Sequence, residues 1–79
     1  MFIINQSGQW AVNSAQVVRF KQAPHDNNKC TAIRAETANN EFTLATYADP
    51  EYADKVFSEL VSSCIISGSD TYMMCEDKG

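Results

Sequence analysis

Residues 47–64 read YADPEYADKVFSELVSSC, and this stretch decides how the chain folds. Asp49 is predicted to be a helix N-cap, because its carboxylate can accept the free N–H groups of a first helical turn. Pro50 follows at the first helical position, where its missing N–H costs nothing. Apolar and small residues then recur every three or four positions, which predicts one stripe facing a core. The members of this stripe are Ala53, Val56, Phe57, Leu60, Val61, Cys64 and Ile65.

A β-hairpin is predicted immediately before this helix, over residues 31–37 and 42–47. Asn39 and Asn40 are taken as its two turn residues, because asparagine tolerates the positive φ of a type I′ turn. The pairs that follow are Thr37 with Phe42, Glu36 with Thr43, Ala35 with Leu44, Arg34 with Ala45 and Ile33 with Thr46. This register collects the larger apolar side chains on one face, where Ile33, Phe42 and Leu44 would meet Val56, Phe57 and Leu60 of the helix.

The remaining strands are short and the predicted architecture is simple. Strands are expected over residues 2–4, 10–12, 15–22 and 71–75, a loop over residues 23–29, and a helix stop at Gly68. The whole chain, residues 1–79, is predicted to be a single α+β domain. It would hold a small, mostly antiparallel sheet of four to five strands with one amphipathic helix on one face, in the order β-β-β-β-α-β.

Composition excludes several classes of function. The 79 residues have no apolar run near the ~20 needed to cross a bilayer, and the start, MFIINQSGQW, lacks the basic region of a signal peptide. We therefore expect a cytoplasmic protein with no membrane partner. The net charge is −4, and residues 35–79 carry nine acidic and two basic side chains. A field of this sign disfavours nucleic-acid phosphates.

The side chains that carry catalysis or bind metals are few and scattered. His25 is the only histidine, and the three cysteines (Cys30, Cys64 and Cys75) lie far apart and are interpreted as small buried hydrophobes. A zinc site would need a Cys-x2-Cys pair or a similar spacing, which is absent. His25 is interpreted as a solvated loop side chain, and a catalytic Cys30–His25 pair would require Cys30 to fold back towards it. We expect no catalytic residues, no metal, no cofactor and no enzymatic activity.

Binding through a surface is the function that the composition leaves open. Partner contacts are predicted at Glu51, Tyr52, Asp54, Glu59 and Met74. Met73 and Met74 are neighbours on a strand, so one of them points to the core and the other points away. Three alternatives remain: the acidic residues are simply a solvated helix face, the protein dimerises through a sheet edge and one of these methionines, or it binds nucleic acid weakly through Arg19, Lys21 and Arg34.

A family resemblance supplies further context. The opening MFII, the turn QSGQ, the run VNSAQVVRF and the closing helix followed by TYMM resemble small phage and prophage proteins of low-GC Gram-positive bacteria. The residues that carry the likeness are Phe2, Ile3, Ile4, Asn13, Val17 and Val18. The resemblance implies a protein that binds and inhibits a host protein, and a subset of such proteins resembles anti-CRISPR inhibitors of a nuclease. It implies no catalytic residues.

Overall fold

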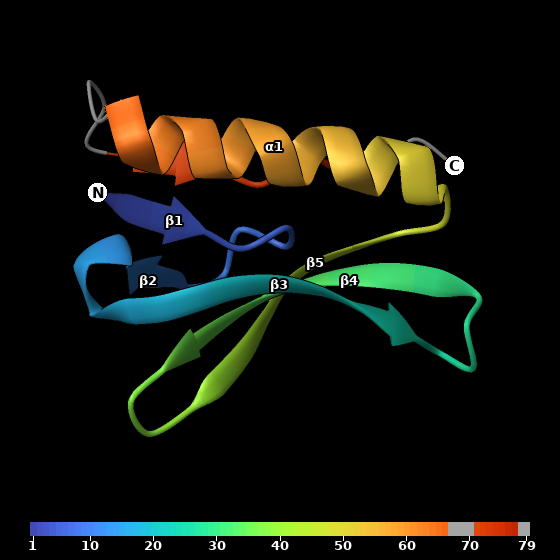
Figure 1. The fold of residues 1–79 in the computed structure, drawn as a ribbon, viewed down its shortest axis with the longest axis horizontal. Helices are drawn as coiled ribbons and strands as arrows, with labels where there is room; N and C mark the ends of the chain where they lie inside the picture. The colour runs from blue at the N-terminus through green and yellow to red at the C-terminus, as the bar shows by residue number, and fades with distance from the viewer. Residues whose placement is uncertain (67–70, 78–79) are drawn as a thin grey trace.

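The computed structural model describes residues 1–66 and 71–77, and it shows two small β-sheets with one long helix packed against them (Figure 1). The helix, α1, spans Pro50–Ile66. The strands are β1 (Phe2–Ile4), β2 (Ala11–Asn13), β3 (Val17–His25), β4 (Cys30–Thr37), β5 (Glu41–Tyr47) and β6 (Thr71–Met73), with a short 3-10 helix, η1, over Ser14–Gln16. The predicted α+β class and the predicted helix are therefore confirmed. Gly68, the predicted helix stop, lies outside the described residues.

The strands divide between two three-stranded sheets. One sheet has the order β3-β4-β5 and is antiparallel throughout. The other has the order β2-β1-β6, in which β1 is antiparallel to β2 and parallel to β6. A parallel pair needs a crossover connection, and here the larger sheet and α1 together supply it. The largely antiparallel pairing agrees with the sequence, whereas the division of six strands into two sheets was not predicted.

The strand β3 is longer than its sequence indicated. Residues 23–25 were expected in a loop, but Ala23, Pro24 and His25 continue the strand and pair with β4. Pro24 is tolerated because β3 lies at the edge of its sheet. The connection to β4 is a tight turn in which Asp26, Asn27 and Asn28 take left-handed φ values of 53°, 54° and 68°. Asp and Asn adopt this conformation more easily than other non-glycine residues.

The β4–β5 hairpin forms where it was predicted, but its predicted register is wrong. The observed pairs are Glu36 with Glu41, Ala35 with Phe42, Arg34 with Thr43, Ile33 with Ala45, Ala32 with Thr46 and Thr31 with Tyr47. The turn is closed by a 2.8 Å bond from Thr37 N to Asn40 O, so Ala38 and Asn39 are its central residues. Neither Ala38, Asn39 nor Asn40 has a positive φ, so Asn39 and Asn40 do not form the expected type I′ turn.

A β-bulge at Leu44 changes the register between the two halves of the hairpin. The register shifts between Ile33 and Arg34, which leaves Leu44 as the extra residue on β5. As a result Leu44 and Ala45 are both buried, although they are consecutive. Near the turn, the observed register differs from the predicted one by two residues, which leaves Arg34 and Thr43 on the polar face predicted for them. Beyond the bulge the difference is one residue, so Ala45 lies on the apolar face instead of the polar one.

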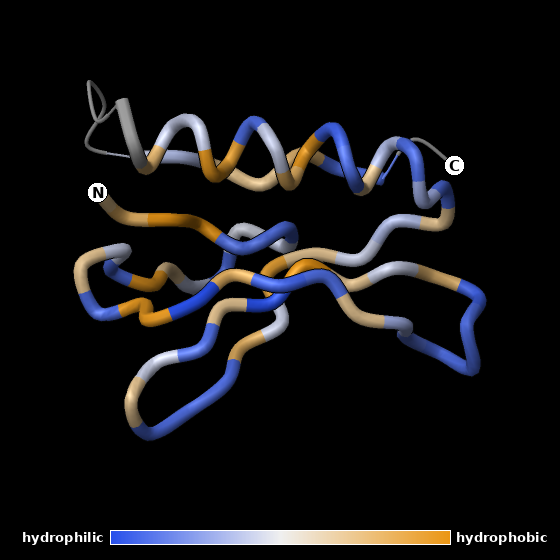
Figure 2. The backbone as a smooth tube through the Cα atoms, in the orientation of Figure 1, coloured by the Kyte–Doolittle hydropathy of each residue, from blue (hydrophilic) through white to orange (hydrophobic). Residues whose placement is uncertain are grey.

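The core lies between α1 and the two sheets. Asp49 caps the helix as predicted: its Oδ1 accepts a 3.0 Å bond from Glu51 N. Apolar segments on β1 and on one side of α1 face inward, and the hairpin turns are hydrophilic (Figure 2). The core cluster contains Ile3, Val12, Ile33, Ala35, Leu44, Ala45, Tyr47, Ala53, Val56, Leu60 and Met74, with Phe42 and Phe57 packed against it. The predicted meeting of hairpin and helix is thus confirmed.

Candidate functional site

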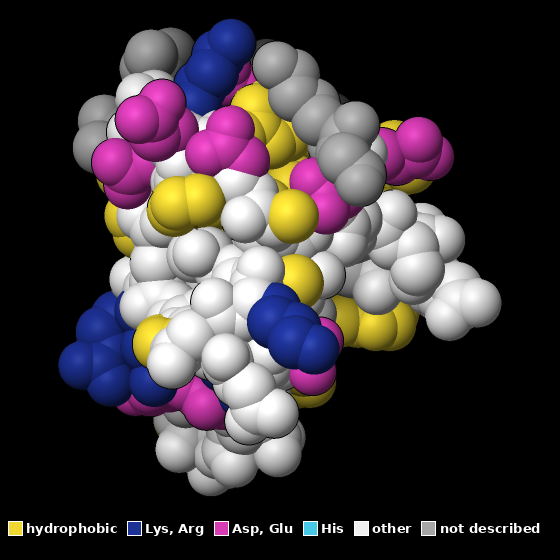
Figure 3. All heavy atoms as spheres, turned by 90° about the vertical axis from the view of Figure 1, so that its right-hand side faces the viewer, with side chains coloured by type: hydrophobic (Ala, Val, Ile, Leu, Met, Phe, Trp, Pro, Cys, Tyr) yellow, Lys and Arg dark blue, Asp and Glu magenta, His cyan; other side chains and the backbone are white. Residues whose placement is uncertain are grey.

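The acidic residues predicted on α1 are exposed, and the structure adds acidic residues from the C-terminal segment to them. Glu51 lies in the first helical turn, directly after Pro50. The Oδ2 atom of Asp77 accepts a 3.2 Å bond from Ala48 N, which brings the C-terminal segment beside the start of α1. We call the exposed residues Asp49, Glu51, Asp54, Glu76 and Asp77 the acidic end. Figure 3, which faces this end, shows acidic side chains gathered in the upper half, over α1.

Two of the three helix carboxylates that were predicted to act together, Asp54 and Glu59, lie on different sides of α1. Asp54 is on the side of β3, where its Oδ1 accepts a 2.8 Å bond from Gln22 Nε2. Glu59 is on the side of Tyr52 and Tyr72. Burial raises the pKa of both phenols, and the negative charge of Glu59 adds to the rise. A flat partner surface therefore cannot contact Asp54 and Glu59 equally, and the acidic end is the more compact group.

Tyr52 belongs to an aromatic cluster at the base of α1 and is half-buried. Its ring packs edge-on against Tyr47, with centroids 5.4 Å apart. The Tyr47 hydroxyl donates a 2.6 Å hydrogen bond to the carbonyl oxygen of Cys75. Burial raises the pKa of Tyr47, and burial together with the neighbouring Cys75 raises the pKa of Tyr72 to about 12. Tyr52 thus packs where α1, β5 and the C-terminal segment meet, and its side chain is partly exposed.

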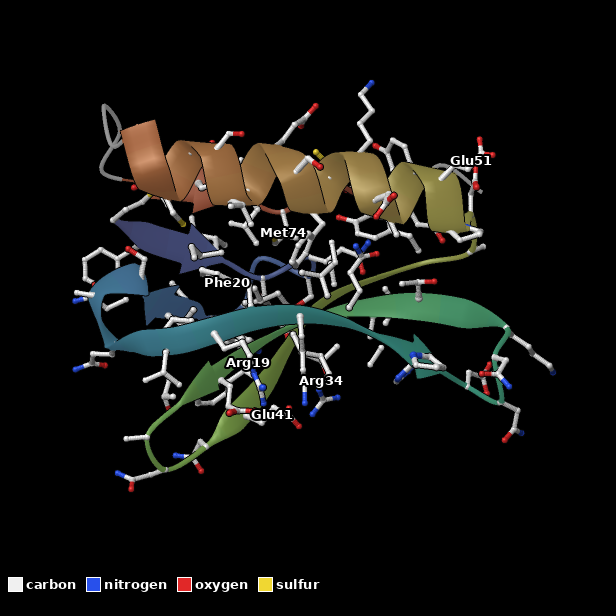
Figure 4. All side chains as sticks on the ribbon, in the orientation of Figure 1. Arg19, Phe20, Arg34, Glu41, Glu51 and Met74 are labelled. Atoms are coloured by element: carbon white, nitrogen blue, oxygen red, sulfur yellow. The ribbon has the colours of Figure 1, made fainter. Side chains whose placement is uncertain are left out.

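The assignment of Met74 to a binding surface is wrong. Its side chain is 2% exposed in the core, whereas Met73 is 59% exposed. Figure 4 shows Met74 directed between α1 and the sheets. The alternation along the strand was predicted correctly, but which methionine faces outward depends on the parallel pairing of Met73 with Ile4. On the outer face of the smaller sheet, Met73 and Phe2 (53% exposed) form what we call the apolar strip.

The basic residues considered for nucleic-acid binding do share one surface. Arg19 and Arg34 lie on the face of the larger sheet that is turned away from α1 (Figure 4). Lys21 shares this face, because it is the cross-strand partner of Arg34. Each is paired with a carboxylate: Arg19 with Glu36 at 2.9 Å, and Lys21 and Arg34 with Glu41 at 2.5 and 2.8 Å. Hydrogen bonds from Lys21 and Arg34 hold the pKa of Glu41 below its ordinary range. This mutual pairing leaves little positive charge for a phosphate backbone.

The surface of the described residues includes two grooves of a size to hold a small ligand. The first, about 350 Å³, lies between the β3–β4 turn and the start of α1 and includes Lys29, Cys30 and Pro50 in its lining. His25 and Cys30 are cross-strand partners, as a catalytic pair would require, but His25 is exposed to solvent. The second, which we call the Phe42 groove, is about 550 Å³ and lies between β2 and the β4–β5 turn.

Sequence reasoning missed the Phe42 groove because its polar residues were interpreted as turn formers.

In the described part of the chain, no group of three or more His, Cys, Asp or Glu side chains is arranged to hold a metal ion. Nor does any helix there have the length and hydrophobicity to span a bilayer. Comparison of the chain with protein-family models, curated proteins and solved structures finds no match. These comparisons therefore assign no role to any residue of the acidic end or of the grooves.

Proposed function

We propose that the protein is a non-enzymatic protein-binding module that docks its acidic end onto a basic surface of a partner protein. One observation carries this proposal: carboxylates from two distant segments, the start of α1 and the C-terminal segment, converge at one end of the molecule. The bond between Ala48 and Asp77 fixes that convergence. Exposed carboxylates gathered at one end of a molecule present a negative surface that attracts a basic surface of a partner.

The partner class follows from charge. A protein that holds nucleic-acid phosphates presents a groove rich in Lys and Arg, and exposed carboxylates can occupy such a groove in place of phosphates. The resemblance to phage-type proteins supports the same interpretation, since it implies an inhibitor of a host protein. We therefore place the protein in the bacterial cytoplasm, as an anti-CRISPR-like inhibitor of a CRISPR effector or of another nucleic-acid-binding protein.

Inhibition of this kind needs no chemistry from the protein itself. Occupying a surface blocks the nucleic acid by competition, so the module acts without catalytic side chains or a cofactor. We place two residues nearest the partner: Glu51, in the first turn of α1, and Tyr52, at the edge of the aromatic cluster. Asp54 has a second task, since it also holds Gln22 of β3.

The experiment is capture of partners from a Gram-positive lysate by the wild-type protein and by a charge-reversed variant, Glu51→Lys with Glu76→Lys. The control replaces four exposed uncharged residues at the far end, Ala15, Gln16, Ala38 and Asn39, with lysine. It changes the net charge by +4, as the reversed variant does. We expect the reversed variant to lose the captured protein, the control to keep it, and heparin to displace it from the wild type. Equal capture by both variants would exclude the acidic end.

The apolar strip favours a second candidate function, assembly as a homodimer. Phe2 and Met73 are among the most exposed large hydrophobic side chains described. Apolar side chains on a sheet face are a common form of interface when they are covered by a partner. Sedimentation equilibrium distinguishes the two functions: a dimer that dissociates in Phe2→Thr with Met73→Thr supports assembly, and a monomer at millimolar concentration supports the inhibitor.

A further inference from the structure

We propose that the Phe42 groove is a binding site for a neutral saccharide, separate from the acidic end. The groove has a volume of about 550 Å³, which is within the range of pockets that hold small ligands. Its lining comprises Ala11, Val12, Gln16, Thr37, Ala38, Asn39, Asn40 and Phe42. No charged side chain is among them, so an ionic ligand would find no counter-charge in the groove.

The polar side chains of the groove are three amides, from Gln16, Asn39 and Asn40, and the Thr37 hydroxyl, which bonds the backbone of Asn40. Within the described residues these amides make no hydrogen bond, so all three are free to bind a ligand. Each amide presents both a donor and an acceptor. A sugar hydroxyl also donates and accepts, so a pair of neighbouring hydroxyls matches one amide.

The backbone segments that carry the amides are held by local hydrogen bonds. Thr37 N bonds Asn40 O at 2.8 Å, and the Thr37 hydroxyl also bonds Asn40, so the β4–β5 turn is closed twice. On the opposite wall, Gln16 belongs to η1, whose preceding residue Asn13 accepts a 3.0 Å bond from Ala15 N. A binding site whose backbone is already ordered loses less entropy when a ligand binds.

An aromatic pair supplies the apolar side of the site. Phe42 lines the groove and Trp10 packs against it, with ring centroids 5.6 Å apart and the planes tilted by 48°. Trp10 is 38% exposed and adjoins the groove through its contact with Phe42. The C–H face of a pyranose ring packs on such aromatic surfaces while its hydroxyls reach the neighbouring amides. Glu41, the nearest acid in sequence, lies on the other face of the sheet with Lys21 and Arg34.

A proline-rich peptide is the other ligand that aromatic grooves commonly hold. Such a peptide offers carbonyl acceptors but few donors, because proline has no N–H. It would use the donor half of each amide and leave the acceptor half unpaired. Three amides that each offer both halves therefore favour a ligand rich in hydroxyl groups.

The test is an NMR titration of the ¹⁵N-labelled protein with neutral hexasaccharides of glucose, N-acetylglucosamine, mannose and xylose, and with a proline-rich peptide. Trp10 is the single tryptophan, so its indole N–H is an unambiguous probe, and the side-chain amide signals of Gln16 and Asn39 report the opposite walls. We expect one of the saccharides to shift these signals at concentrations of about 10 mM or below.

Three variants check the site. Trp10→Ala is expected to weaken saccharide binding by about tenfold or more. Gln16→Ala with Asn39→Ala changes exposed positions, so the variant stays folded, and the same loss is expected. Gln9→Ala removes an exposed amide outside the groove and should bind normally. The proposal is overturned if none of the saccharides shifts the signals, if the proline-rich peptide alone shifts them, or if the double variant binds as the wild type does.

Discussion

The side-chain amide of Gln6 pairs with the backbone of Thr46 at both of its polar atoms. Gln6 Nε2 donates to Thr46 O at 3.0 Å, and Gln6 Oε1 accepts from Thr46 N at 3.1 Å. The backbone N–H of Gln6 also donates to Leu44 O at 2.8 Å. Because β5 is an edge strand, these bonds satisfy groups that would otherwise be exposed, and they join the turn after β1 to the larger sheet.

Replacing Gln6 with alanine should therefore destabilise the fold. The variant leaves Thr46 N and Thr46 O without partners in a partly buried site, which costs about 1–3 kcal/mol. Urea unfolding followed by circular dichroism measures the change. Gln9→Ala is the control, since that side chain is exposed in the same turn, and its effect should be within about 0.5 kcal/mol. Equal stability of the two variants would show that the amide pairing contributes nothing.

Tyr47 makes a second link of this kind, between β5 and the C-terminal segment. Tyr47→Phe keeps the buried ring but removes the 2.6 Å bond to Cys75 O, and we expect a loss of about 1–3 kcal/mol in unfolding free energy. Tyr72→Phe is the matched control, because no hydrogen bond from its hydroxyl is present among the described residues. Calorimetry of both proteins should show the lower melting temperature for Tyr47→Phe. A lower value for Tyr72→Phe would contradict the role given to this bond.

The buried phenols also predict how stability depends on alkaline pH. The pKa of Tyr72 is raised from 10.0 to about 12, and that of Tyr47 is raised as well, so the folded state holds these protons more tightly than the unfolded state. This contribution to stability is complete below pH 10 and is lost as the pH rises toward 12. Urea midpoints measured across this range should fall less steeply for Tyr72→Phe than for the wild type. If the urea midpoints of the two proteins fall equally steeply, the Tyr72 hydroxyl is as exposed to water in the folded state as in the unfolded state.

Acid should weaken the opposite face of the molecule. The pKa of Glu41 lies below its ordinary 4.5 because Lys21 and then Arg34 donate hydrogen bonds to the carboxylate. Its contribution is present above pH 4.5 and is lost as the pH falls through the lowered value. Glu41→Gln should flatten the acid limb of the stability curve, with a small effect at neutral pH because the group is exposed. An acid limb that is as steep in Glu41→Gln as in the wild type would contradict the role given to these hydrogen bonds.

Much of the fold follows from local sequence signals, and the parts that do not are set by distant pairing. Asp49, Pro50 and the apolar spacing of α1 define the helix through interactions within a few residues. The hairpin register depends instead on Leu44, whose bulge is stabilised by Gln6 from 38 positions earlier in the chain. Long-range bonds of this kind leave no local pattern, which is why the division into two sheets was not predicted.

The same distinction applies to the candidate site. The exposure of Glu51 could be predicted because α1 is amphipathic and its polar side is defined by spacing alone. The acidic end could not, since it depends on a bond between Ala48 and Asp77. The wrong choice of Met74 has a similar cause: strand alternation says that one methionine faces inward, but the pairing of β6 with β1 decides which one.

The two methionines give a direct test of this packing. Met74 is 2% exposed and belongs to the core cluster, so Met74→Ala removes buried atoms and should cost about 2–5 kcal/mol of unfolding free energy. Met73→Ala makes the same chemical change one residue earlier, where the side chain is 59% exposed, and should cost less than about 0.5 kcal/mol. Chemical denaturation of the two variants measures both values. If Met73→Ala proves the more destabilising, β6 pairs with β1 in the other register, and the apolar strip of Phe2 and Met73 does not exist.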